Sequence, residues 1–189
     1  MKLKRSILLA VLAAFVLIML ACTIFIGGPD YPDRAIPVST EAVGELQTSI
    51  EQAVALGAVS GQVTLTITEP QLTSYLAMKL QQQADPFLTN PQVYLQDGQI
   101  QIYGTAVQGY FQATAAIVLT AGVDDTGQLA IELTSADFGP LPVPEGLLDA
   151  VTAMVEEAFT GAVGPVATGI RLTSITVANG VMTVTGQIK

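Results

Sequence analysis

The chain has 189 residues, of which 50% are apolar and only 12% are charged, with no His, no Trp and one Cys. This apolar content excludes a disordered protein, and the length suits one domain with or without an anchor. The missing His and single Cys exclude His-based triads, His-ligated metals, zinc fingers and disulfide frameworks. From residue 30 onward the chain has four basic residues and all 16 acids, a net charge of 4 − 16 = −12. This charge repels phosphate backbones and excludes nucleic-acid binding.

The first segment is an uncharged run from Ile7 to Ile26, preceded by three basic residues. About 20 apolar residues cross a bilayer as a helix, so the run predicts one N-terminal transmembrane helix within an anchor of residues 1–28. A lipoprotein lipidated at Cys22 and a cleaved signal peptide are the alternatives. Basic residues before the span keep the amino end in the cytoplasm. We therefore expect a single-pass protein of a bacterial-type cell membrane, with its C-terminal domain outside the cytoplasm.

A cluster of Gly, Pro and Asp predicts a linker over residues 29–37, followed by one domain over 38–189. Ser39 or Thr40 caps a helix of about 18 residues, ended by the glycines at 57 and 61. Alternation predicts a strand over 63–68, and Thr68 then caps a second helix whose stripe is Leu72, Tyr75, Leu76, Lys79 and Leu80.

The rest of the chain reads as a meander of strands and one more helix. Hairpin turns are expected at Asp97-Gly98 and Asn179-Gly180, and a proline-rich connector at 139–144. Strands are expected around 93–95 and 100–102, and over 109–122, 129–133, 170–178 and 181–188. The third helix shows the clearest period, with Leu147, Leu148, Val151, Met154, Val155, Ala158 and Phe159 on one stripe. The order predicts an α+β domain whose strongly curved, mainly antiparallel sheet wraps around amphipathic helices.

Four stretches, 65–76, 93–100, 137–144 and 177–182, occur in the order seen in a known group. In them the chain resembles the LmeA-like and YpmS-like extracytoplasmic proteins of the tubular lipid-binding (TULIP) superfamily. The resemblance covers residues 38–189. It implies a curved sheet around a long helix, an apolar groove able to hold a lipid chain, and a membrane-tethered envelope protein without established catalytic residues.

The expected function is binding or carrying a membrane lipid or other apolar ligand in a groove between sheet and helices. The candidate lining residues are Leu76, Leu80, Leu148, Val151, Val155 and Phe159. Such stripes more often form ordinary core, so the alternative is a non-catalytic envelope scaffold with a filled interior and an unknown protein partner.

An enzyme is not expected, and neither is a cofactor or a structural metal. Glu156 and Glu157 are adjacent, and adjacent residues on a helix point apart, which makes them a poor acid–base couple. Asp124-Asp125 is typical of a turn, with a weak calcium site as the alternative interpretation.

Overall fold

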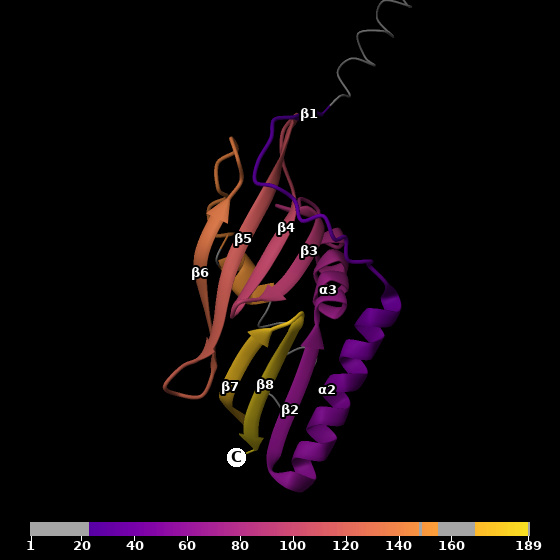
Figure 1. The fold of residues 1–189 in the computed structure, drawn as a ribbon, viewed down its shortest axis with the longest axis vertical. Coiled ribbons are helices and arrows are strands. Elements are labelled where there is room, and N and C mark those ends of the chain that lie inside the picture. The colour runs from indigo at the N-terminus through magenta and orange to yellow at the C-terminus, as the bar shows by residue number, and fades with distance from the viewer. Residues whose placement is uncertain (1–22, 148, 155–168, 189) are drawn as a thin grey trace, which may run out of the picture.

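Strands and two long helices make up most of the computed structural model, which describes residues 23–147, 149–154 and 169–188 (Figure 1). The strands are β1 (Ile24–Phe25), β2 (Gln62–Thr68), β3 (Thr89–Gln96), β4 (Gln99–Gln108), β5 (Phe111–Val123), β6 (Leu129–Asp137), β7 (Ile170–Ala178) and β8 (Val181–Ile188). The helices are α2 (Thr40–Ser60), α3 (Glu69–Gln81) and a third one that includes residues 149–154. This is the expected α+β class, with strongly curled sheet covered by helices.

The strands form two sheets, where the sequence predicted one. One sheet has the order β1-β5-β4-β3, with β6 also paired to β5, and the other has the order β2-β8-β7. All pairs are antiparallel except the short β1–β5 pair. The prediction of a single sheet was wrong because the β3–β4 and β7–β8 hairpins turn where they meet, which ends both ladders at this junction. The turns touch through two hydrogen bonds, from Gly98 N to Val177 O (3.0 Å) and from Gly180 N to Leu95 O (2.8 Å).

Both predicted two-residue turns are confirmed. The φ angles are 54° at Asp97 and 77° at Gly98, and 55° at Asn179 and 79° at Gly180. Positive φ at both central residues is the type I′ geometry, whose twist matches that of the flanking strands. These turns therefore fix the registers of β3–β4 and β7–β8.

Helix α2 packs along β2 and beside α3. The Ser39 side chain accepts a hydrogen bond from Ala42 N (3.1 Å), which confirms the predicted N-cap. Gly57 lies inside the helix, where a Cβ atom would approach Val63 Cγ2 to 2.4 Å, so a glycine is needed for close packing. The helix ends at Gly61, whose φ of 77° is typical of a glycine C-cap.

Helix α3 begins with the predicted Thr68 cap, and Gln71 completes a capping box with it. Its apolar stripe faces the interior, whereas four polar side chains elsewhere on the helix are also buried, and Glu69 and Thr73 among them bond to β3. The four buried polar residues are Glu69, Gln71, Thr73 and Ser74. The helix therefore buries both apolar and polar side chains.

The segment predicted as a linker lies along β3 and makes specific contacts there. The Tyr31 hydroxyl donates to Asn90 O (3.0 Å), and the Gln92 amide donates to Ile36 O (3.1 Å) while accepting from Ile36 N. The Tyr94 hydroxyl also donates to the backbone carbonyl of this segment. Ile36 is only 5% exposed, so the segment forms part of the packed structure.

Most of the predicted anchor, with Cys22, lies outside the described residues. Its last part does not continue as a helix, because Ile24 and Phe25 form β1 beside β5. Within the described ranges no helix is long and apolar enough to cross a membrane.

Candidate functional site

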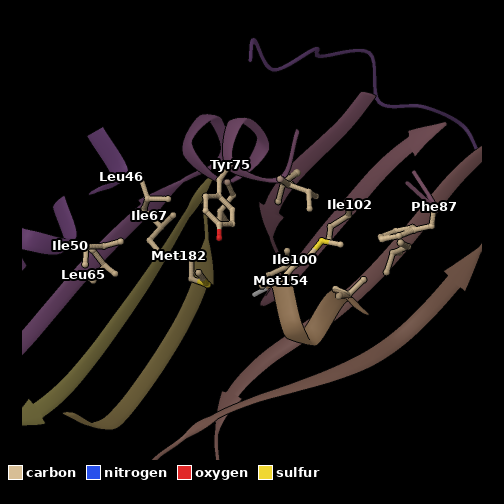
Figure 2. Close-up of a pocket in the computed structure, with 15 residues that line it drawn as sticks. Leu46, Ile50, Leu65, Ile67, Tyr75, Phe87, Ile100, Ile102, Met154 and Met182 are labelled. Carbon is tan, nitrogen blue, oxygen red and sulfur yellow. The ribbon is translucent and has the colours of Figure 1, made fainter. Parts of the chain in front are cut away.

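An apolar cavity lies between the two sheets and the helices, and Figure 2 shows its lining. Side chains from α2, α3, the third helix and strands of both sheets surround it. They are Leu46, Ile50, Leu65, Ile67, Leu72, Tyr75, Leu76, Phe87, Val93, Ile100, Ile102, Ile117, Val151, Met154 and Met182. The cavity therefore crosses the junction between the sheets.

The chemistry of this lining is almost purely hydrocarbon. No lining residue is charged, and Tyr75 is the one among them that carries a hydroxyl group. The cavity volume is about 60 Å³ of space open to the centre of a water molecule. One water needs about 10–15 Å³ by that measure, but it also needs polar partners, and apolar cavities stay dry. The space suits a hydrocarbon chain better than water.

Strand alternation explains how one wall of the cavity forms. In the larger sheet, Val93 of β3 lies opposite Ile102 of β4, which lies opposite Ile117 of β5. Directly opposed residues point to the same side of a sheet, so the three side chains form one apolar row. In the smaller sheet, Ile67 of β2 lies opposite Met182 of β8 and builds the matching wall.

Helix α3 contributes the side chains that join the two walls. The ring of Tyr75 projects between the group around Ile67 and Met182 and the group around Ile100 and Met154 (Figure 2). Leu72 and Leu76 flank it at helical spacing. The apolar stripe of α3 therefore spans the middle of the cavity.

Of the predicted lining residues that the structure describes, two line the cavity and one does not. Leu76 and Val151 line the cavity, whereas Leu80 is 2% exposed in the packed core and is not among the lining residues. Leu148, Val155 and Phe159 lie outside the described residues. Both Leu76 and Leu80 fit the helical stripe, so the period alone could not separate them.

Most of the lining was not singled out from the sequence. It comes from inward positions of strands, such as Leu65 and Ile67 of β2 and Ile100 and Ile102 of β4. The signal was present as strict alternation, with the threonines of β2 and the glutamines of β4 between them. The sequence does not show how these strands pair, and it is this pairing that places them around one cavity.

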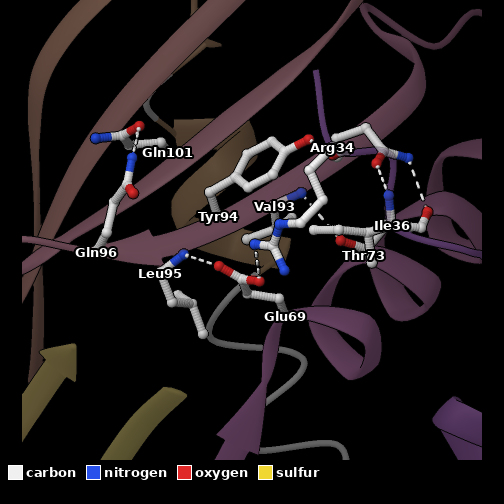
Figure 3. Close-up of polar contacts among 10 residues, drawn as sticks. Arg34, Ile36, Glu69, Thr73, Val93, Tyr94, Leu95, Gln96 and Gln101 are labelled. Carbon is white, nitrogen blue, oxygen red and sulfur yellow. Dashed lines mark hydrogen bonds and ion pairs between the residues drawn. The ribbon is translucent and has the colours of Figure 1, made fainter. Parts of the chain in front are cut away.

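A buried polar cluster lies on the other side of α3 and is drawn in Figure 3. Glu69 Oε1 accepts from Leu95 N (3.0 Å), and Thr73 Oγ1 accepts from Val93 N (2.9 Å). Glu69 also pairs with Arg34, whose side chain is 66% exposed. These groups hydrogen-bond the free edge of β3, so their role is structural, since a buried N–H without a partner is costly.

Two tyrosines beside this cluster have shifted pKa values. Burial, with a smaller effect of Tyr94, raises the pKa of Tyr31 to about 12. Burial also raises the pKa of Tyr94, although Arg34 acts in the opposite direction. Both phenols are therefore held neutral, as hydrogen-bond donors.

The acid pair Asp124-Asp125 lies in a turn, as predicted. Asp124 Oδ1 accepts from Thr126 N (2.8 Å), Thr126 Oγ1 (2.7 Å) and Gln128 N (2.8 Å). The bonds from Gln128 and Thr126 lower the pKa of this carboxyl. In the described part of the chain, no three His, Cys, Asp or Glu residues gather in a group able to hold a metal ion. Glu156 and Glu157 lie outside that part.

Comparison of the sequence with known proteins identifies a family for the domain that holds this cavity. No curated protein matches the chain. The family model for LmeA-like phospholipid-binding proteins matches residues 34–187, which begins at Arg34 beside β3 and ends in the last strand. The match thus includes every described residue that lines the cavity, and the chain belongs to the LmeA-like phospholipid-binding family.

Proposed function

We propose that this protein is tethered to a membrane by its N-terminal run and binds an acyl chain of a phospholipid in the cavity beside Tyr75. The observation that carries the proposal is an uncharged cavity within a domain of a phospholipid-binding family. Ordinary protein interiors contain few voids larger than a water molecule, because unfilled space loses dispersion contacts. A retained apolar cavity is therefore consistent with an occupant.

The location follows from charge. Basic residues precede the uncharged run, and all 16 acids lie after it. This asymmetry supports an amino end in the cytoplasm and a domain on the outer side of the membrane. A domain held there is next to a supply of phospholipid. No described group calls for a reaction step, and the proposed role is binding or carriage.

The alternative is a scaffold with a filled interior. Native mass spectrometry of the full chain, released from detergent micelles in the gas phase, separates the two. Lipid binding predicts discrete added masses that match phospholipids, whereas a scaffold predicts the mass of the chain alone. Retention of detergent only, with no lipid mass, would contradict the proposal.

A matched pair of variants shows whether any adduct sits in the cavity. In Leu76→Trp the larger indole occupies the space beside Tyr75, so the lipid adduct should disappear. In the control, Leu56→Trp, the same ring replaces a side chain that is 71% exposed on α2, and the adduct should remain. Equal loss in both variants would mean that the lipid binds elsewhere.

A further inference from the structure

Large apolar side chains are exposed together where β1 meets the β4–β5 hairpin, at one end of the molecule (Figure 1). We call this group the apolar tip. Its members, with their exposed fractions, are Ile24 (53%), Phe25 (62%), Val107 (40%), Tyr110 (61%) and Phe111 (47%). A group of this kind on a protein surface marks an interaction site.

The tip is apolar on both faces of the ribbon. Ile24 pairs with Phe111 and lies on one face, while Phe25 and Val107 both pair with Gln112 and lie on the other. A protein partner with a flat surface covers one face. A fluid hydrocarbon layer surrounds both, so this arrangement favours insertion over docking.

The tip also lacks charge in a strongly acidic domain. The sequence has no charged residue from 98 to 123 and none from 24 to 29. A charge near a bilayer interior is expensive, so its absence from the whole hairpin removes the main cost of insertion. The acids that keep the rest of the domain in water lie elsewhere.

Backbone groups along the β1 side of the tip already have partners. Ile24 N donates to Tyr110 O (2.7 Å), Ile26 N donates to Gln112 O (2.8 Å), and Thr114 N donates to Gly27 O (2.9 Å). Unpaired N–H and C=O groups are costly in lipid. The β1 pairing therefore satisfies the edge of β5 where it enters the tip.

Glycine holds this segment close to β5. A Cβ atom at Gly28 would approach Thr114 O to 2.2 Å, so no other residue fits without moving the backbone. The position of β1 relative to the hairpin is fixed by this contact.

We propose that the apolar tip inserts into the outer leaflet of the membrane that holds the N-terminal anchor. β1 is the last part of the uncharged run that is predicted to reach the bilayer, so no linker separates the anchor from the tip, and each residue of chain covers at most about 3.6 Å. The tip therefore lies at the surface of that bilayer. Tyr and Phe side chains with aliphatic neighbours are typical of the interfacial layer. This inference rests on the membrane attachment in the proposed function, but not on the cavity.

The absence of Trp from the chain permits a direct test. The full-length variant Tyr110→Trp is reconstituted into phosphatidylcholine vesicles with or without bromine atoms on the acyl chains. Bromine quenches an indole only at short range, so the fluorescence of Tyr110→Trp should fall by about half or more, as for an interfacial ring. The control is Val59→Trp, at a position that is 91% exposed near the end of α2 farthest from the tip, and its fluorescence should not change (Figure 1).

Quenching of Tyr110→Trp no stronger than that of Val59→Trp would overturn the proposal. A blue shift without quenching would also overturn it, because the tip would then be covered by protein, such as a second copy. Release of the chain from the vesicles by alkaline carbonate would overturn both the membrane anchor and the insertion of the tip.

A second variant separates the tip from the cavity. Adding Phe25→Ser and Phe111→Ser to Tyr110→Trp should abolish the quenching and leave the circular dichroism spectrum and the binding of a fluorescent acyl probe unchanged. Persistent quenching would overturn the proposal. Failure of the acyl probe to bind any variant, with the quenching intact, would contradict the proposed cavity function and leave the tip in place.

Discussion

Leu76 and Leu80 allow a test of whether the cavity is open space or packed core. They lie one turn apart on α3, and Leu→Ala removes the same three carbon atoms at each. Full burial of these carbons is worth about 2.4 kcal/mol at about 0.8 kcal/mol each, and a new void raises the total to about 2.7–5.0 kcal/mol. Leu80 is 2% exposed in the core, so Leu80→Ala should cost about 3–4 kcal/mol in the free energy of unfolding.

Leu76 lines space that already exists and is partly exposed. Leu76→Ala loses fewer contacts and should cost only about 1–2 kcal/mol. Urea unfolding followed by circular dichroism would detect the difference as a midpoint about 1 M lower for Leu80→Ala at unchanged m. Equal costs near 3 kcal/mol would mean that the stripe of α3 is packed throughout, which would refute the reasoning.

Three more predictions concern the surroundings of the cavity. Thr73→Val keeps the side-chain shape but leaves Val93 N unpaired, so it should destabilise by about 1–3 kcal/mol in urea, and Thr73→Ser should restore stability. Gly180→Val should cost about 1 kcal/mol or more, because a β-branched residue tolerates a φ of 79° poorly; unchanged thermal stability would argue against this turn. Tyr31 in the unfolded chain ionises near pH 10, and its folded pKa is about 12, so its contribution to stability is complete below pH 10 and lost as pH rises toward 12. Tyr31→Phe should therefore reduce the alkaline loss of stability, and an unchanged pH profile would contradict the raised pKa of the buried Tyr31 phenol.

Features that depend on neighbouring residues could be predicted from the sequence. The Ser39 cap, the Thr68 capping box and the Asn179-Gly180 turn all follow from local backbone chemistry, and all three are present. The alternation in β2 likewise predicts which of its side chains are buried. These features need no knowledge of distant partners.

Features that depend on distant contacts could not be predicted. Glu69 and Thr73 look like ordinary first-turn and mid-helix residues, and only the position of β3 shows that they hydrogen-bond its edge. Leu76 and Leu80 have the same residue type and stripe, and only the surrounding space distinguishes them. The division into two sheets is also a long-range property, because it depends on where two hairpin turns meet.

The division into two sheets affects how the domain can bind a ligand larger than its cavity. Across the hairpin turns the two sheets are joined by the Gly98–Val177 and Gly180–Leu95 hydrogen bonds, with a third from Leu172 N to Gly127 O (2.8 Å) at the far end of β7. A continuous ladder could widen only by breaking many hydrogen bonds, whereas only a few backbone hydrogen bonds join the two sheets at this junction. We therefore expect the two sheets to separate from each other at this junction more readily than strands separate within either sheet. Amide hydrogen exchange should then be faster at Gly98 and Gly180 than in the middle of β4 and β5, and it should slow when an acyl chain is bound.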